Sequence, residues 1–275
     1  ANSDVQVLNE TRWWKDGVIQ SSLTNLSSVN SANTSKGQVW NFSARAHDGT
    51  LWGSWANNVT LTIQNALVEI NSLILNSSSL TNYTIENLTA NVLVSEPDGN
   101  ATKIIYDWRK NGNSMAVLNM PFEASTNHSK DYSSYGNNGT ENGSIVWNST
   151  GGYDGFGAYE FDGIDDYINV SNIDQFSFTD QITVMAWVRQ DSFTDWTKYV
   201  TRGRDSCGPP YVNVYLGGWN GINKQSPRWA LGIGNTLVET SSSVDFEITE
   251  NNWTHLVGTY DGSYLRLYAN GFEIA

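Results

Sequence analysis

The stretch WTHLVGTYDGSYLRLYANG, residues 253–271, decides the fold of the C-terminal part of this chain. Two runs rich in β-branched and aromatic residues flank Asp261-Gly262, and an Asp-Gly pair between such runs is a strong signal for a two-residue hairpin turn. From Leu265 onward every second residue is apolar, which is the period-two pattern of a half-buried strand. Asn270-Gly271 offers a second tight turn. The stretch therefore predicts an antiparallel hairpin.

The composition of the whole chain favours an all-β protein. The chain has 24 glycines and 12% aromatic residues but only 5 prolines. Strand-like runs recur between turns of Asn, Ser, Gly and Asp, which is typical of β-sandwiches. At 275 residues the chain is long enough for two or three domains.

Charge and cysteine content exclude several classes of protein. The formal net charge is −13, which argues against nucleic-acid binding because a polyanion requires a basic surface. The single cysteine excludes an intrachain disulfide. The sequence shows neither a signal peptide nor an apolar run long enough to span a membrane, so we expect a mature or excised segment without its own anchor.

The sequon for N-glycosylation, Asn-x-Ser/Thr, occurs fifteen times. A chain rich in Asn, Ser and Thr forms some sequons by chance, yet this density favours an exported protein at the cell surface. The candidate glycosylation acceptors are Asn9, Asn25, Asn33, Asn41, Asn58, Asn76, Asn82, Asn87, Asn100, Asn127, Asn138, Asn142, Asn148, Asn169 and Asn252.

A short motif occurs twice in the N-terminal part. Arg12–Gly17, RWWKDG, is echoed by Asp107–Gly112, DWRKNG. Between the two copies, Trp40 and Phe42 belong to an apolar set at every second position, which predicts a core-facing side. With the segments GQVWNFSA and HDG, residues 1–64 resemble immunoglobulin-like sandwiches of the polycystic-kidney-disease or fibronectin type III kind, found as repeats on microbial, often archaeal, surface proteins.

Residues 65–115 contain the first strands of a second such unit. Ile70–Leu75, Leu88–Ser95 and Ala101–Trp108 predict three strands, too few to bury both faces of a sandwich. Either the segment is cut from a tandem array or the second unit is interrupted, and we favour insertion of the C-terminal domain into a loop of the second unit. The remaining strands then lie downstream or come from a neighbouring chain. Alternatively, residues 70–112 pack on residues 1–64 and form one sandwich with them.

Residues 116–275 resemble laminin-G-like (concanavalin A-like) jelly-roll domains. The motifs that carry the resemblance follow the order of the family: AVLNMPFE at 116–123, DYSSYGNNGT at 131–140, YEFDGIDDYINV at 159–170, ITVMAWVR at 182–189, residues 199–203 and the hairpin at 253–271. The resemblance implies two antiparallel sheets face to face, with a buried set that includes Ile182, Val184, Trp187, Leu256 and Leu265. It also implies further strands after the Asn-Gly turn, so we expect the C-terminal strands of the jelly roll to be missing from this segment.

The sequence carries no recognisable catalytic motif. Glycosidases that share the jelly roll place their carboxylates on one strand as E-x-D-x-E or E-x-D-x-x-E, a spacing absent here, although Glu247 and Glu250 come near it. The histidines His47, His128 and His255 are dispersed and lack metal-ligand spacing. We therefore predict a non-enzymatic protein.

Two acidic loops offer oxygen ligands for Ca²⁺, which takes about six to eight of them. The resemblance implies calcium near the first loop, because related jelly rolls often hold the ion there. The alternative is that these residues only form turns. The candidate ligands are Asp131, Asn137, Asn138, Asp162 and Asp165, with Asp131 and Asp162 expected to be the best.

Aromatic side chains offer stacking platforms for sugars when they are exposed. The Gly-, Asn- and Asp-rich region contributes four candidates for ligand binding: Trp196, Tyr211, Trp219 and Trp229. Trp187 and Trp253 fall within strand motifs, so we expect them to pack in the core. For Trp196 and Trp219, stacking on a ligand and packing in the core stand as equal alternatives.

The sequence thus predicts an all-β chain in which immunoglobulin-like sandwich strands precede a concanavalin A-like jelly roll. We expect an extracellular, cell-surface protein for adhesion or glycan recognition, with glycans, other surface proteins or copies of itself as partners. The rival hypothesis is a structural subunit of a surface layer, sheath or filament that is completed by strand exchange between subunits.

Overall fold

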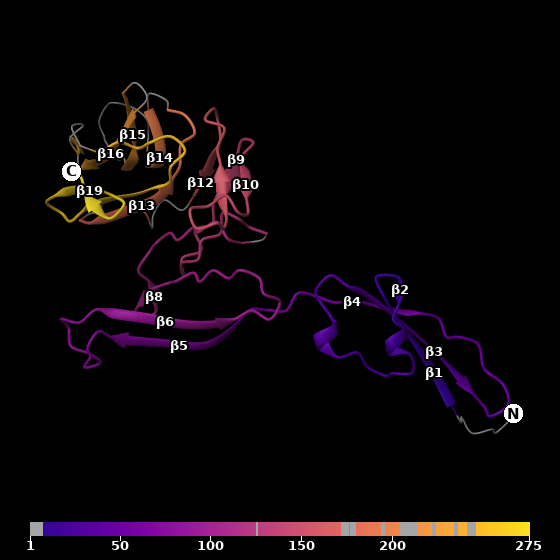
Figure 1. The fold of residues 1–275 in the computed structure, drawn as a ribbon. Helices are drawn as coiled ribbons and strands as arrows, with labels where there is room; N and C mark the ends of the chain where they lie inside the picture. The colour runs from indigo at the N-terminus through magenta and orange to yellow at the C-terminus, as the bar shows by residue number, and fades with distance from the viewer. Residues whose placement is uncertain are drawn as a thin grey trace. The chain divides into compact units, whose positions relative to one another are not determined.

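The computed structural model describes residues 8–124, 126–171, 176, 180–193, 196–203, 214–221, 224–233, 236–240 and 246–275. The regular secondary structure of the described chain is β-strand apart from two short 3-10 helices, which confirms the all-β prediction (Figure 1). Its contacts divide it into two compact units, Ala1–Ile104 and Ile105–Ala275.

The first unit contains an antiparallel sheet in the order β2-β1-β3-β4. The strand bounds are β1 Leu8–Lys15, β2 Val18–Ile19, β3 Val39–His47 and β4 Val59–Thr62. Asp16 and Gly17 form the predicted tight turn, with φ of 49° and 81°, between the paired residues Lys15 and Val18.

The predicted apolar side of β3 faces a small core. Trp40 is buried, and its ring centroid lies 6.3 Å from that of Trp13, edge to face. The Phe42 ring lies 4.6 Å from Trp13. Leu26 O accepts a hydrogen bond of 2.9 Å from Trp13 Nε1, so the loop that follows β2 covers this side of the sheet.

The other side of the same sheet carries a stack of arginine and tryptophan. Arg45 Cζ lies 4.5 Å from the ring centroid of Trp52 and 4.8 Å from that of Trp55, and Arg12 Cζ lies 4.2 Å from Trp55. Glu10 pairs with both arginines. The hydrogen bond from Arg45, aided by Arg12 and opposed by desolvation, lowers the pKa of Glu10.

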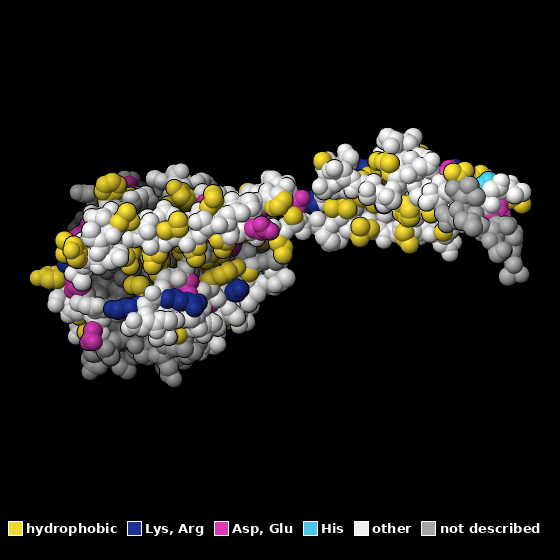
Figure 2. Space-filling view, turned by 90° about the horizontal axis from the view of Figure 1, so that it is seen from below, with side chains coloured by type: hydrophobic (Ala, Val, Ile, Leu, Met, Phe, Trp, Pro, Cys, Tyr) yellow, Lys and Arg dark blue, Asp and Glu magenta, His cyan; other side chains and the backbone are white. Residues whose placement is uncertain are grey.

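A separate two-stranded ribbon completes the first unit. Strands β5 (Glu69–Ser77) and β6 (Leu88–Ser95) pair with each other and with no other described strand. The consecutive residues Leu73, Ile74 and Leu75 are all exposed, so apolar side chains stand on both faces of the ribbon. Figure 2 shows hydrophobic side chains along this ribbon. The one-sandwich alternative required this ribbon to pack on β3 and β4, and no strand pairing joins them among the described residues.

The repeated motif forms the same hairpin twice. In the second unit, β7 (Arg109–Lys110) pairs with β8 (Asn113–Ser114) around Asn111-Gly112, whose φ angles are 52° and 88°. The turn thus matches that of Asp16-Gly17. The predicted strand at Ala101–Trp108 is wrong, because this segment has an irregular backbone up to Arg109.

Two small pairs of strands precede the sandwich: β9 (Thr140–Asn142) pairs with β12 (Tyr167–Asn169), and β10 (Val146–Asn148) pairs with β11 (Ala158–Glu160). An aromatic cluster lies beside them. His128 stacks on Trp147 at 3.9 Å, and Phe122 meets Tyr159 edge to face at 5.0 Å.

Two four-stranded antiparallel sheets form the sandwich of the second unit, in the orders β13-β18-β19-β20 and β14-β15-β16-β17. Their bounds are β13 Ile182–Val188, β14 Trp196–Arg202, β15 Val214–Gly221, β16 Lys224–Ile233, β17 Thr236–Glu239, β18 Thr254–Tyr260, β19 Leu265–Ala269 and β20 Phe272–Glu273. Strand β16 faces β19, and β15 faces β18. The buried core between the sheets consists of Val214, Leu216, Trp229, Leu231, Ile248, Leu256, Leu267 and Ala269.

The hairpin at 253–271 is confirmed with one correction. Strands β18 and β19 are joined by four residues rather than two, because the last pair is Tyr260 with Leu265. Asp261 Oδ1 accepts the backbone N–H groups of Ser263 and Tyr264 at 2.9 and 2.8 Å, and this favours the wider loop. Asn270-Gly271 forms the predicted tight turn into β20.

Trp229 fixes the distance between the two sheets. A Cβ atom on Gly258 of β18 would lie 2.2 Å from the Trp229 ring, so the ring rests directly on the glycine backbone. We expect Trp229→Ala to lower the free energy of unfolding by about 3–5 kcal/mol, as other large aromatic truncations in cores do. Chemical denaturation measures this, with the exposed Trp187→Ala as control. Equal losses in the two variants would contradict the assignment.

Candidate functional site

The outward face of the sheet β14-β15-β16-β17 carries one of the candidate aromatic residues, Trp219. Because side chains alternate along a strand, burial of Val214 and Leu216 in the core directs Trp219 outward. The backbone register pairs Trp196 of β14 with Trp219 of β15. Two positions that are 23 residues apart in the sequence are thus paired in the sheet.

Trp219 is 43% exposed and lies beside an ion pair. Arg228 of β16 has its Cζ atom 5.8 Å from the Trp219 ring centroid and pairs with Glu239 of β17. Nearby, the hydroxyl of Tyr215 donates its hydrogen bond to Thr197 O at 2.8 Å, and Gly218 O lies 3.3 Å from the same hydroxyl oxygen. A flat apolar ring bordered by hydrogen-bonding groups is an arrangement that suits a sugar, whose ring has an apolar face and a polar edge.

The prediction that Trp229 binds ligand is wrong. Trp229 is fully buried, and its Nε1 donates a hydrogen bond of 3.0 Å to Thr259 O across the sandwich. It alternates with Arg228, so one of the two had to face the core. The fourth aromatic candidate, Tyr211, lies outside the described residues.

The prediction that Trp187 is buried is also wrong. Ile182 and Val184 pack on the core as expected, and the alternation of β13 therefore turns Trp187 to the outside, where it is 43% exposed. Tyr153 stacks on its ring at 3.7 Å and His255 at 4.9 Å. Burial among these rings lowers the pKa of His255. The sequence patterns did not identify Tyr153, because it lies in a glycine-rich loop outside any strand pattern.

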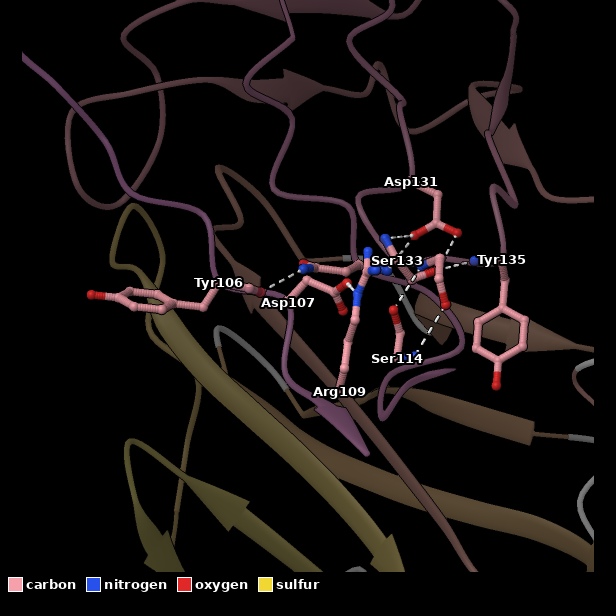
Figure 3. Close-up of polar contacts among 9 residues, drawn as sticks. Tyr106, Asp107, Arg109, Ser114, Asp131, Ser133 and Tyr135 are labelled. Carbon is pink, nitrogen blue, oxygen red and sulfur yellow. Dashed lines mark hydrogen bonds and ion pairs between the residues drawn. The ribbon is translucent and has the colours of Figure 1, made fainter. Parts of the chain in front are cut away.

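The first acidic loop is a network of hydrogen bonds centred on Asp131 (Figure 3). The buried carboxylate accepts the backbone N–H groups of Asn119 and Ser133 on Oδ1, both at 2.9 Å. Its Oδ2 accepts Ser133 Oγ–H at 2.6 Å and the backbone N–H of Asn137 at 2.7 Å. Burial raises the pKa of Asp131, but these hydrogen bonds outweigh burial and lower it.

The network also fixes the second copy of the repeated motif. Ser114 in β8 exchanges two hydrogen bonds with Ser134, at 3.0 and 2.7 Å, and Asn119 Nδ2 donates to Tyr106 O at 3.1 Å. Asn138 Oδ1 accepts the backbone N–H of Asp131. Asn137 Nδ2 donates to Val117 O. The polar atoms of this loop therefore serve the fold of the second unit.

The second acidic loop brings three carboxylates together. Asp162, Asp165 and Asp166 have ligand oxygens within 4.8 Å of one another, and the described acidic residues form no other such group. Asp131 is not part of this group. Asp162 Oδ1 accepts the backbone N–H of Ile164 at 2.8 Å, so part of the loop is also a turn held by its own side chain. Asp166, which the predicted ligand set omitted, belongs to the cluster.

None of the fifteen sequon asparagines is buried. Ten are exposed, whereas Asn41, Asn76, Asn100, Asn142 and Asn148 are half-buried. Whether any of them carries a glycan stays a prediction.

The hydrogen bonds to Asp131 predict a pH dependence of stability. Since the folded state lowers this pKa, the carboxylate stabilises the fold above its unfolded pKa of about 3.9, and the contribution is lost as pH falls through the folded pKa. We expect Asp131→Asn to lower the melting temperature clearly at pH 7 and progressively less below pH of about 4. The exposed Asp191→Asn serves as control. A melting-temperature difference that does not change with pH would contradict this account.

Comparison with family models matches residues 162–275 to the concanavalin A-like lectin/glucanases superfamily. No curated protein and no solved structure matches the chain. None of the described helices has the length and apolar character needed to cross a membrane. The immunoglobulin-like repeats and the archaeal origin stay predictions. Over residues 162–275 the chain is therefore similar to concanavalin A-like domains, which confirms that part of the predicted fold.

Proposed function

We propose that this chain is a non-enzymatic extracellular surface protein that recognises glycans through the outward face of β14-β15-β16-β17. The exposed Trp219 carries the proposal, because it stands on a sheet whose other face forms the core. Its neighbour in register is a second tryptophan, Trp196. The match to a superfamily that includes lectins supports the same conclusion.

Binding without hydrolysis is supported by the state of the nearby carboxylate. The superfamily name covers glucanases as well as lectins, and a glycosidase needs two carboxylates that flank the scissile bond. Among the described residues, Glu239 holds its carboxylate in an ion pair with Arg228, whose guanidinium lies beside Trp219. Such a pair offers a donor and an acceptor to sugar hydroxyls.

Location outside the cell is supported by the sequons. Ten of the fifteen acceptors are exposed, and they occur on both units, as attachment of glycans at a surface requires. The net charge of −13 also suits a solvated surface protein.

A structural role as a subunit of a larger assembly is the second candidate. The ribbon β5–β6 favours it, because its apolar side chains are exposed on both faces and its edges are unpaired among the described strands. Such ribbons are only marginally stable alone, and open edges invite strand addition.

A glycan array tests the recognition proposal. We expect the wild-type protein to bind a subset of glycans and Trp219→Ala to bind them roughly fivefold more weakly, since loss of one stacking ring removes on the order of 1 kcal/mol. Trp187→Ala is the matched control, because Trp187 has the same exposed fraction but stands on the opposite sheet. Binding that survives Trp219→Ala but not Trp187→Ala would place the site elsewhere.

Calcium at the turn of Asp162, Asp165 and Asp166 is the second part of the proposal. Three clustered carboxylate oxygens fit the preference of Ca²⁺ for hard oxygen ligands, and water molecules can complete the shell. Bound Ca²⁺ would neutralise this acidic turn. Asp131 is excluded from the set, because both of its oxygens already accept two hydrogen bonds each.

Thermal unfolding with Ca²⁺ or a chelator tests this part. A ligand that binds only the folded state stabilises it by about 2.7 kcal/mol at a concentration a hundredfold above Kd, so the melting temperature should rise with Ca²⁺. The rise should vanish in the double variant Asp162→Asn, Asp165→Asn and persist in Asp131→Asn. Equal melting curves for the wild type with Ca²⁺ and with chelator would remove the metal from the proposal.

A further inference from the structure

An amine, a primary amide and a carboxylate meet within the first unit. Lys36 lies in the turn that leads into β3, and Asn100 follows the turn after β6, 64 positions further along the chain. Lys36 Nζ donates a hydrogen bond to Oδ1 of Asn100. The nitrogen of a potential nucleophile therefore touches an atom that is bonded directly to the amide carbon Cγ.

The amide of Asn100 is held on its other sides as well. Glu96 accepts the backbone N–H of Asn100 on Oε2 at 2.6 Å and its Nδ2–H on Oε1 at 3.1 Å. Nδ2 also donates to Asn65 Oδ1 at 3.0 Å. Close by, Asp98 accepts the backbone N–H of Ala66 at 2.6 Å. The carboxylate of Glu96 thus contacts the nitrogen that would leave if the amine attacked Cγ.

We propose that Lys36 and Asn100 form a covalent amide cross-link, with Glu96 as the catalytic acid–base. The exposed Lys36 ammonium first gives one proton through solvent to the Glu96 carboxylate, and the neutral amine then attacks Cγ. A bond forms between Nζ and Cγ, a second proton passes from Nζ to Nδ2, and the bond between Cγ and Nδ2 breaks. Glu96 passes a proton to the departing nitrogen. Overall, one alkylammonium group and one primary amide give one secondary amide and one ammonium ion, so atoms and charge balance without any further reactant.

The close approach of the amine to the amide favours this step. Amides resist amines in dilute solution, but well-oriented groups within one molecule reach effective molarities of about 10⁵–10⁸ M. The cross-link forms once in the lifetime of each molecule, so a slow reaction is sufficient. Asn65 and Glu96 orient the amide while Lys36 stays at its oxygen.

A covalent cross-link would stabilise the first unit. The chain has one cysteine and therefore no intrachain disulfide. The ribbon β5–β6 buries little of its apolar surface, and small units of this kind are commonly stabilised by cross-links. The bond would close the loop from residue 36 to residue 100 and tie the turn before β3 to the turn after β6. It would also remove Asn100 from the glycan acceptors, because both modifications use the same nitrogen.

Mass spectrometry of the full chain, produced in a host without N-glycosylation, tests the proposal. We expect an intact mass below the sequence mass by one ammonia and, after trypsin, a branched peptide that joins the segments containing Lys36 and Asn100. Cleavage after Lys36 should be blocked. Lys36→Arg and Asn100→Ala should each restore the unmodified mass, whereas Lys15→Arg should keep the cross-link. Glu96→Gln should slow its formation at least tenfold.

Two results would overturn the proposal, and both come from the wild-type protein, so neither depends on how well a variant folds. The first is recovery of Lys36 and Asn100 only in separate linear peptides. The second is an ammonia loss that maps to a cyclised Asn-Gly pair, such as Asn111-Gly112, with no branched peptide.

Discussion

The contact between Trp229 and Gly258 holds the sandwich of the second unit together. The indole fills the space that a side chain on Gly258 would need, and its N–H reaches the backbone of the opposite sheet at Thr259. Once Trp229 points inward, alternation along β16 sends Arg228 outward, where it lies next to Trp219. The candidate glycan face is therefore a geometric consequence of the core, and the same packing that stabilises the fold presents the aromatic ring.

The positions of two tryptophans show what sequence patterns can and cannot decide. Strand β13 was correctly predicted, yet Trp187 could not be buried together with Ile182 and Val184, since neighbours of opposite parity face opposite sides. The burial of Trp229 could be predicted from the pattern, because Trp229 alternates with Arg228 and lies on the same side of the strand as Leu231. The pairing of Trp196 with Trp219 depends on the register between two strands, including an irregularity after Lys198, and no local pattern specifies that.

Turns and loops also differ in how far the sequence predicts them. Both copies of the repeated motif give identical two-residue turns, because Asp-Gly and Asn-Gly tolerate the positive φ that such turns need. Asp131 was predicted to bind calcium, because the sequence shows only a carboxylate in a polar loop. The four donors that converge on it come from separate positions of the chain, which no local pattern specifies. The acidic turn at Asp162 was predicted from the carboxylates that follow closely in its sequence, and there the local chain brings them together.

The most direct test of the central claim is to locate a bound sugar by nuclear magnetic resonance. The full chain, with ¹⁵N-labelled tryptophan, would be titrated with the oligosaccharide that it binds best, and the indole N–H signals would be assigned with Trp219→Phe and Trp187→Phe. The account predicts that the signal of Trp219 shifts and saturates while that of Trp229, bonded to Thr259 O in the core, stays in place. Saturable binding that leaves the Trp219 signal unmoved would contradict it.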